Sequence, residues 1–340
     1  MKIFERIMRN SMIWIKKLGE ILFFLVSCFL VLLLTETMLK GYFRDSLDLD
    51  MEMWKYAVNL KEKGEEYPNY HVHKPDSQAF LMGNRVTIND MGLRDELDFS
   101  MKDKNEFSIF FVGDSFTFGW GVSNDETFSE LIEKKLESKA ASCGLKIRGY
   151  NLGVGNYNSI HELDLLTSIS RFTAPDLVVL THFINDAEPV IESDRPAWYQ
   201  RTYLFGFVQS KLMRINQRKE FTNYYSDLYK SEGWSGNQRA LLAMKSFAEK
   251  TTNFSLEVFL LPELRSMGPE SELSEVYSLR SRFFSHNEYN FTDLSPYLSR
   301  FEPEALFVSL EDSHTNGFAN RQIINIMAKK ITPLLQERCL

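Results

Sequence analysis

The first forty residues divide into a basic end and a long apolar run. From Ile21 to Leu34 every residue except Ser27 is apolar, which approaches the length of a short membrane-spanning helix. Basic residues precede this run and acidic residues follow it: Lys2, Arg6, Arg9, Lys16 and Lys17 on one side, and Glu36, Asp45, Asp48 and Asp50 on the other. Because cytoplasmic flanks carry the excess of Lys and Arg, the pattern predicts a cytoplasmic N-terminus over residues 1–17, a transmembrane anchor over residues 18–38, and the remaining chain outside the cytoplasm.

Two other interpretations of this run are open. A cleavable signal peptide needs small residues at a cleavage site, and the segment after the run, Thr35 to Met38, offers no such site. The segment Leu25 to Cys28 resembles a bacterial lipobox, but the residues after Cys28 remain apolar up to Leu34, where a polar tether is usual. An uncleaved anchor therefore uses the whole run best.

Beyond the anchor, the polar and apolar pattern changes twice. Residues 39–100 mix charged residues with Pro and Gly, which predicts a juxtamembrane stalk with loops leading into a domain. From residue 101 onward, short apolar runs typical of buried parallel strands alternate with helical periodicity. Strands are predicted at residues 107–112, 147–152, 177–182 and 256–261, and helices between Phe128 and Gly144, over residues 163–172 and over residues 318–331. This alternation predicts a doubly wound α/β fold whose ligands bind at the carboxyl ends of a parallel sheet.

Composition narrows the class of protein. With 44% hydrophobic and 25% charged residues the chain has the balance of a globular protein, and its net charge of −7 leaves no basic surplus for binding nucleic acid. The three cysteines, Cys28, Cys143 and Cys339, lie far apart without a CxxC pair. They predict neither a zinc knuckle nor a dense disulfide framework, so the fold is expected to depend on its apolar core.

Four separated motifs follow the predicted strands. The sequence Gly113-Asp114-Ser115 comes directly after the first strand, where a serine at a strand-to-helix turn is held out of the sheet. The other motifs are Asn151 to Asn158 after the second strand, Asn185-Asp186 after the third, and Asp312-Ser313-His314-Thr315-Asn316 near the C-terminus. In order and spacing they resemble the SGNH hydrolases, also called the GDSL lipase and esterase superfamily, over about residues 85 to 335.

This resemblance implies a fold and a site. The fold is the three-layer α/β/α, flavodoxin-like SGNH fold, here over residues 101–340 with a helical insert at about 191–250 that we expect to cap the site. The implied nucleophile is Ser115 and the base is His314, while the oxyanion donors are the Ser115 amide, the Asn185 side chain and an amide of the second motif. The implied chemistry needs no cofactor and no metal.

Two positions depart from the usual family pattern. Asn156 stands where the family usually has glycine and Gly155 precedes it, so the amide of either residue can serve as the second-motif donor, with Asn156 placed first. The family acid usually stands three residues before the histidine, which is Glu311 here, whereas Asp312 lies two residues before it. We favour Asp312 because its shorter side chain loses less rotamer entropy when it is held against the imidazole.

Other candidate residues have a plain structural interpretation beside a functional one. His71 and His73 alternate as a metal-binding pair would, but without a third ligand nearby they are expected at the surface. Trp120 is placed either to stack on a sugar ring or to pack in the wall of the site. Asn89 and Arg94 are expected to stabilise a loop, and His182 to pack at a strand end.

The resemblance and the topology together give an expected function. They predict a membrane-anchored SGNH serine esterase or O-acyltransferase in the bacterial periplasm, acting on O-acyl esters, above all O-acetyl esters, of envelope glycans, beside polysaccharide-modification partners. Water or a sugar hydroxyl can attack the same acyl-enzyme, so the sequence does not separate hydrolysis from transfer. The alternatives are a lipid esterase or lysophospholipase, and a catalytically idle scaffold or glycan-binding module.

Overall fold

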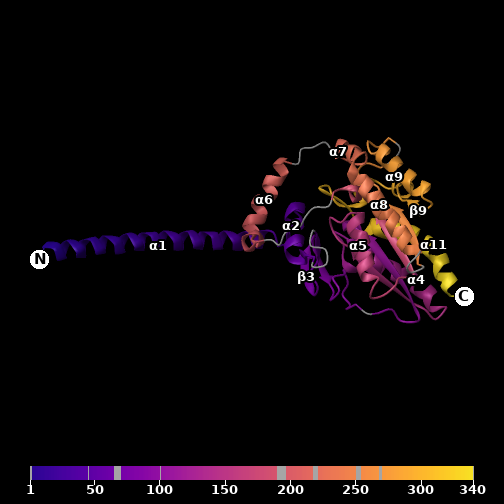
Figure 1. Cartoon of the computed structure of the whole chain (residues 1–340), viewed down its shortest axis with the longest axis horizontal. Helices are drawn as coiled ribbons and strands as arrows, with labels where there is room; N and C mark the ends of the chain where they lie inside the picture. Colours follow the sequence, from indigo (N-terminus) through magenta and orange to yellow (C-terminus); the bar gives the residue numbers. More distant parts are fainter. Residues whose placement is uncertain are drawn as a thin grey trace.

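A five-stranded parallel sheet organises the body of the chain in the computed structural model, which describes residues 2–44, 46–64, 70–99, 101–189, 197–216, 221–249, 254–267 and 270–339 (Figure 1). The strand order is β6-β5-β7-β8-β9, which is the flavodoxin-like order 2-1-3-4-5 when the strands are numbered along the chain. The strands are β5 (Glu106–Gly113), β6 (Lys146–Gly153), β7 (Leu177–His182), β8 (Ser255–Leu260) and β9 (Asn290–Asp293). Every residue of β5 and β7 is buried, which explains why these central strands form continuous apolar runs.

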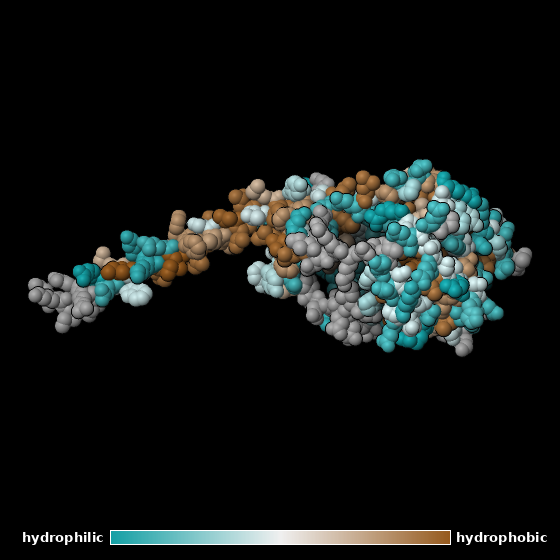
Figure 2. Space-filling model, turned by 90° about the horizontal axis from the view of Figure 1, so that it is seen from above, coloured by the Kyte–Doolittle hydropathy of each residue, from teal (hydrophilic) through white to brown (hydrophobic). Residues whose placement is uncertain are grey.

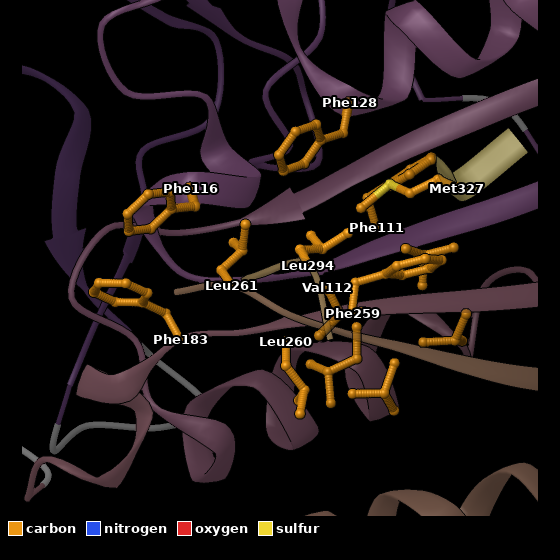
Figure 3. Packing of buried hydrophobic residues seen from close by; sticks show 14 of the residues in the cluster. Phe111, Val112, Phe116, Phe128, Phe183, Phe259, Leu260, Leu261, Leu294 and Met327 are labelled. Carbon is orange, nitrogen blue, oxygen red and sulfur yellow. The ribbon is translucent and has the colours of Figure 1, made fainter. Parts of the chain in front are cut away.

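Helices form the outer layers of the body. The helix α4 packs against α11 in one layer, and α5 packs against α8 in the other. The helices of the body are α3 (Ser115–Phe118), α4 (Phe128–Ala141), α5 (Ser159–Ile169), α8 (Glu232–Phe247), α9 (Ser274–His286), α10 (Ser295–Leu298) and α11 (Gly317–Arg338). Between the layers, Phe111, Val112, Phe259, Leu260 and Met327 pack in a core without solvent exposure (Figure 3).

The predicted three-layer α/β/α fold is thereby confirmed, with four of its five strands. The fifth strand, β9, was missed because it has only four residues and its burial is mixed. The predicted helix after the first strand begins at Phe128, as its apolar pattern indicated. Thr127 caps α4, whereas Asn124 belongs to a short 3-10 turn before it (Asn124–Glu126).

The N-terminal helix α1 (Lys2–Tyr42) extends away from the body (Figure 1). Its segment Met8–Tyr42 is long and apolar enough to cross a membrane. A signal sequence near an N-terminus has the same length and apolar composition. The helix is longer than the predicted span at both ends. Its apolar side chains are exposed along the shaft, which is the hydrophobic surface in Figure 2.

Residues 46–64 and 70–99 form what we call the N-terminal module. It contains α2 (Leu49–Leu60), the hairpin of β1 (Lys61–Lys63) with β2 (His71–His73), and the hairpin of β3 (Ser77–Leu81) with β4 (Asn84–Ile88). The prediction of a stalk was wrong for this part of the chain. The module packs on the body because the apolar positions Tyr56 and Leu60, one helical turn apart, join Phe118 and Trp120 in a shared cluster.

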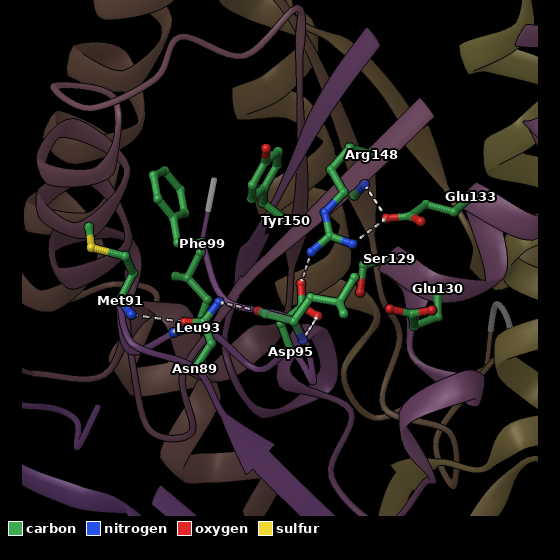
Figure 4. A network of polar contacts seen from close by, with 12 residues as sticks. Asn89, Met91, Leu93, Asp95, Phe99, Ser129, Glu130, Glu133, Arg148 and Tyr150 are labelled. Atoms are coloured by element: carbon green, nitrogen blue, oxygen red, sulfur yellow. Dashed lines mark hydrogen bonds and ion pairs between the residues drawn. The ribbon is translucent and has the colours of Figure 1, made fainter. Parts of the chain in front are cut away.

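Polar contacts also hold the N-terminal module on the body. Asn89 accepts hydrogen bonds from the amides of Met91 and Leu93, which closes the loop that leads to Asp95. The carboxylate of Asp95 pairs with Arg148 of β6 (Figure 4). Asn89 therefore has the loop role that the sequence predicted.

The insert differs from the predicted cap over the site. Its described residues form a 3-10 turn η3 (Trp198–Arg201), α6 (Tyr203–Asn216) and α7 (Phe221–Leu228), while residues 191–196, 217–220 and 250 lie outside the description. The helix α6 contacts α1 and α2 rather than the sheet edge. Both α7 and α8 contact the 3-10 turn after β7, η2 (Ile184–Ala187), and α8 is the crossover helix to β8.

A disulfide joins the ends of two neighbouring helices. Cys143 follows α4, Cys339 ends α11, and the two residues are 196 positions apart in the sequence with Cα atoms 5.6 Å apart. The pairing follows from the packing of α4 against α11, which brings their C-terminal ends together. Cys28 is unpaired and exposed.

Loss of this disulfide is expected to lower stability. Replacing both Cys143 and Cys339 by Ser removes a cross-link of a kind that contributes about 2–4 kcal/mol, so thermal unfolding in detergent should shift down by roughly 5–10 °C. The matched control Cys28→Ser should leave Tm unchanged. Equal Tm values for the parent and the double variant would contradict a disulfide in the folded chain.

Candidate active site

Ser115 is the first residue of α3, immediately beyond the carboxyl end of β5. Two glycines let this turn lie against the sheet. A Cβ on Gly113 would overlap the hydroxyl oxygen of Thr117, and a Cβ on Gly153 would overlap the backbone of Phe118. Asp114 caps the turn by accepting the Phe116 amide at 2.9 Å, so the serine side chain remains half-buried at the edge of the sheet.

A chain of two hydrogen bonds connects Ser115 to a buried carboxylate. Ser115 Oγ lies 2.7 Å from His314 Nε2, across 199 residues of sequence. His314 Nδ1 lies 2.5 Å from Asp312 Oδ1. Asp312 and His314 both belong to β11 (Asp312–Thr315), which pairs with β10 (Phe307–Ser309) after the 3-10 turn η5 (Pro303–Ala305). The geometry can hold the imidazole in the tautomer that accepts a proton from the serine.

Trp120 holds the acid from the opposite side. Its indole Nε1 donates to Asp312 Oδ2 at 2.8 Å, and both side chains are buried, with exposed fractions of 4% for Trp120 and 1% for Asp312. Burial alone would raise the pKa of Asp312, but hydrogen bonds from His314 and Trp120 hold that pKa below its usual value. Neither sequence interpretation of Trp120 included this bond, because nothing in its spacing connects it to Asp312.

The two candidate acids lie in different surroundings. Asp312 is bonded to the imidazole, whereas Glu311 is exposed to solvent. The structure therefore brings Ser115, His314 and Asp312 together.

Asn185 approaches the serine from the end of β7. It lies half-buried in η2, with its side chain close to the carboxylate of Asp114. Burial raises the pKa of Asp114, while the Phe116 amide, His314 and the Asn185 side chain oppose that rise. Because a carboxamide NH2 has two hydrogens, Asp114 can fix one of them and leave the second for a bound oxygen.

The second motif contributes one free amide. The Gly155 N–H donates to the Tyr56 hydroxyl at 2.9 Å, so it is occupied. The Asn156 N–H has no partner among the described residues, and neither has the Ser115 N–H. Asn156 adopts φ +68°, the left-handed conformation that asparagine tolerates better than most residues.

The remaining candidates are placed in structural networks. The expectation that His71 and His73 lie at the surface was wrong for His73, which is buried between the Tyr56 hydroxyl at 2.7 Å and the Gly92 carbonyl at 3.1 Å. His71 Nε2 donates to the Gly155 carbonyl at 2.9 Å. The described residues contain no group of three or more acidic, His or Cys side chains arranged to hold a metal ion.

Arg94 and His182 also have defined surroundings. The Arg94 guanidinium donates to the carbonyls of Phe118 and Val122, each at 2.8 Å, and so fixes the turn that follows α3. His182 is buried at the end of β7, with Nδ1 3.6 Å from the Asp186 carboxylate. Arg94 therefore stabilises a loop and His182 packs at a strand end, as the sequence predicted.

Comparisons with known proteins find similar folds but no close relative. No protein-family model matches the sequence, and no curated protein matches it. Among solved structures, the chain is similar to a lipase/acylhydrolase from Enterococcus faecalis, with 14% identity over 66% of this chain and 95% of that one and a TM-score of 0.41. It is also similar to a putative acylhydrolase from Bacteroides fragilis, with 16% identity over 69% and 91% of the two chains and a TM-score of 0.40.

A further similar structure is a two-domain esterase active on acetylated mannans, with 11% identity, coverage of 68% of this chain and a TM-score of 0.42. Our chain spans about half of that esterase, 50% of its length. The strand order of the sheet and the positions of the four motifs at its strand ends are those of the SGNH hydrolase fold. The chain therefore has the fold of the SGNH hydrolases.

The bond from Trp120 to Asp312 predicts a measurable effect on the serine. A fluorophosphonate probe should label Ser115, and Trp120→Phe should slow this labelling roughly tenfold, because a buried carboxylate that loses a donor is destabilised by about 1–3 kcal/mol. The rate of labelling is followed by fluorescence of the modified chain. The control Trp234→Phe, which alters a tryptophan stacked on Tyr229 rather than bonded to Asp312, should label at the parent rate. Labelling of Ser115→Ala at parent strength would contradict the assignment of the serine.

Proposed function

We propose that the chain is a serine ester hydrolase or O-acyltransferase that works through an acyl-enzyme. The observation that carries the proposal is the continuous hydrogen-bonded path from Ser115 through His314 to the buried Asp312. Ser115 Oγ attacks the ester carbonyl carbon while His314 Nε2 takes the hydroxyl proton, and Asp312 stabilises the imidazolium.

The negative oxygen of the tetrahedral intermediate needs fixed donors. In this proposal they are the backbone amides of Ser115 and Asn156 together with the side-chain amide of Asn185. The intermediate then collapses, and His314 returns the proton to the departing alcohol. Water completes a hydrolysis and a hydroxyl group of a second substrate completes a transfer, each by attack on the same ester of Ser115.

The substrate class that we propose is a small acyl ester, above all an O-acetyl group, of an envelope glycan. Two aromatic rings support a small acyl group, because Phe116 and Phe183 pack at 4.4 Å between ring centroids and Phe116 also contacts the His314 ring at 4.8 Å. Both rings are buried, and we infer that they limit the size of the acyl group beside the serine. The assignment of a glycan as the carrier of the ester rests on the resemblance of the four motifs to those of the SGNH hydrolases.

We further propose that α1 anchors the enzyme with its body outside the cytoplasm, in the periplasm. The basic N-terminal end and the exposed apolar shaft of α1 support this orientation. The disulfide between Cys143 and Cys339 supports it independently, since such bonds form in oxidising compartments. Glycan-modification proteins of the same envelope are the partners that this location implies.

The experiment that tests the function compares acyl chain lengths on the full chain in detergent. Release of the alcohol from aryl acetates and aryl decanoates, and of acetate from acetylated glycans, is measured for the parent and for Ser115→Ala. We expect hydrolysis of acetyl esters that Ser115→Ala abolishes. A preference for decanoate would favour a lipid esterase, and activity that survives in Ser115→Ala, or none in the parent, would favour the idle scaffold.

The choice of acid gives a second prediction. Asp312→Asn should lower kcat by roughly 10⁴-fold, because the amide no longer holds the reactive tautomer of His314. Glu311→Gln is the matched control at the neighbouring exposed carboxylate and should retain activity near the parent value. Reversal of the two results would exchange the acids and leave Ser115 and His314 in their roles.

The role of Asn185 gives a third prediction. Asn185→Ala removes one oxyanion donor, which lowers kcat by about 100-fold to 1000-fold in serine enzymes, with KM little changed. Steady-state kinetics on an aryl acetate measures both constants. A rise in KM alone would mean that Asn185 binds the ground-state ester and does not stabilise the transition state.

A further inference from the structure

Side chains of the N-terminal module hydrogen-bond the peptide unit that carries the Asn156 N–H. Lys61 Nζ donates to the Gly155 carbonyl at 2.7 Å, and His71 Nε2 donates to the same oxygen at 2.9 Å. Lys61 Nζ also lies 3.2 Å from Asn156 Oδ1 and 4.3 Å from the centre of the Tyr56 ring. Lys61, His71 and Tyr56 belong to the N-terminal module, outside the four motifs.

The preceding amide is fixed by a relay in the same module. His73 Nδ1 faces the Gly92 carbonyl, which can only accept, so Nδ1 carries the proton and Nε2 accepts from the Tyr56 hydroxyl. The Tyr56 oxygen is then free to accept the Gly155 N–H at 2.9 Å. Both polar groups of Gly155 are therefore held by the N-terminal module.

Because the peptide bond is planar, hydrogen bonds to the Gly155 carbonyl also fix the orientation of the Asn156 N–H. The Gly155 carbonyl and the Asn156 N–H belong to one planar trans peptide unit and point in opposite directions. Two donors on the carbonyl therefore fix the direction of the N–H, and a cationic donor polarises the unit so that the N–H becomes a stronger donor.

We propose that Lys61 is a positioning residue that orients and polarises the Asn156 amide for the oxyanion. The inference rests on the proposed function and adds to it a residue that no motif contains. Lys61 acts through the Gly155 carbonyl and does not touch the ester. The positive charge of Lys61 thereby acts on the oxyanion through the Gly155–Asn156 peptide unit.

The proton on Lys61 makes the role visible in a pH profile. Burial lowers the pKa of Lys61 to about 7, and the groups that face it are Tyr56, His71, His73 and His161. Because the active form of Lys61 is the protonated one and its pKa is lowered, its contribution is full below pH 7 and is lost as the pH rises through about 7. His314 acts in the opposite sense, since a general base must be unprotonated.

The test measures kcat, KM and their pH dependence on an aryl acetate for the full chain. Lys61→Met should lower kcat about tenfold with KM within about twofold, and should remove the fall in kcat near pH 7. Lys61→Arg should keep the charge and shift that fall to higher pH. The control Lys74→Met changes an exposed lysine at the end of the same hairpin and should match the parent.

The outcomes separate this inference from the proposed function. A parent-like kcat and pH profile in Lys61→Met overturns the role of Lys61 while Ser115→Ala still tests the esterase. If Lys61→Met does not fold, an unchanged pH profile in Lys61→Arg overturns the inference. Activity that survives in Ser115→Ala overturns the proposed function itself.

A second and independent observation concerns the side of α6 that faces away from α2. The helix begins beside α1, where the Glu36 carboxylate accepts the amides of Tyr203 and Leu204 at 2.7 and 3.0 Å. Gly206 on the inner side packs closely on the ring of Trp54 in α2. Exposed or half-buried apolar side chains of η3 and α6 form a surface, which we call the outer face: Trp198 and Tyr199 of η3, and Phe205, Val208 and Leu212 of α6.

We propose that the outer face rests on the lipid surface at which α1 leaves the membrane. Glu36 lies two residues beyond the apolar run, so α6 begins at the level where the run ends. Figure 1 shows α6 running across the direction of α1, as a helix in the membrane plane would run. Exposed Trp and Tyr are typical of the membrane interface, and Phe205, Val208 and Leu212 follow the spacing of an interfacial helix.

The test places a fluorophore at single cysteines of the full chain in vesicles of phosphatidylethanolamine and phosphatidylglycerol. In a Cys28→Ser background that keeps the disulfide, spin-labelled lipids should quench a probe at Leu212→Cys and not one at Leu242→Cys, an exposed leucine of α8. A probe at Leu30→Cys reports whether α1 is inserted. Quenching at residue 30 with equal signals at 212 and 242, or cross-linking of Leu212→Cys to a second copy, overturns the proposal; no quenching at residue 30 overturns the anchor as well.

Discussion

The convergence of parallel strand ends is the constraint on which the site depends. In the order β6-β5-β7, the strand β5 lies between its two successors along the chain, so α4, which connects β5 to β6, and α5, which connects β6 to β7, lie on opposite faces of the sheet. The turn after β5 therefore faces an open edge, and there the chain places Ser115, with Asn156 beyond β6 and Asn185 beyond β7. The histidine arrives from outside the sheet on the hairpin of β10 and β11, and a bond of 2.7 Å to Ser115 completes the arrangement.

Burial of carboxylates controls the charge at this edge. Asp312 has donors for its oxygens and its pKa stays low, so it is ionised beside the imidazole. Burial raises the pKa of Glu162 and of Asp186 well above the usual values, and the nearby Asp114 carboxylate raises both further. Both Glu162 oxygens lack hydrogen-bond partners within the described chain, as a neutral carboxyl group tolerates better than an ionised one.

The N-terminal module connects the apolar helix to the chemistry. The helix α2 contributes Tyr56 to the shared core with Phe118 and to the hold on Gly155, and the same helix supports α6 beside α1. A segment that separates an anchor from a domain is usually expected to act as a spacer. Here its burial against the turn after α3 makes the geometry of the second motif depend on residues next to the apolar helix α1.

The local sequence determined the elements and the order of the motifs, because period-two and period-3.6 patterns and turn residues act over a few positions. It predicted four of the five strands of the sheet, the position of Ser115 after the first of them, and the apolar helix at the N-terminus. Tertiary structure decided the contacts between distant segments: Trp120 with Asp312 across 192 residues, Tyr56 with Gly155 across 99, and Cys143 with Cys339 across 196. The packing of the N-terminal module on Phe118 is of the same kind. Such pairs form only when the helices and hairpins pack on the sheet. A short sequence pattern describes neighbouring positions and therefore does not determine which distant side chains will contact each other.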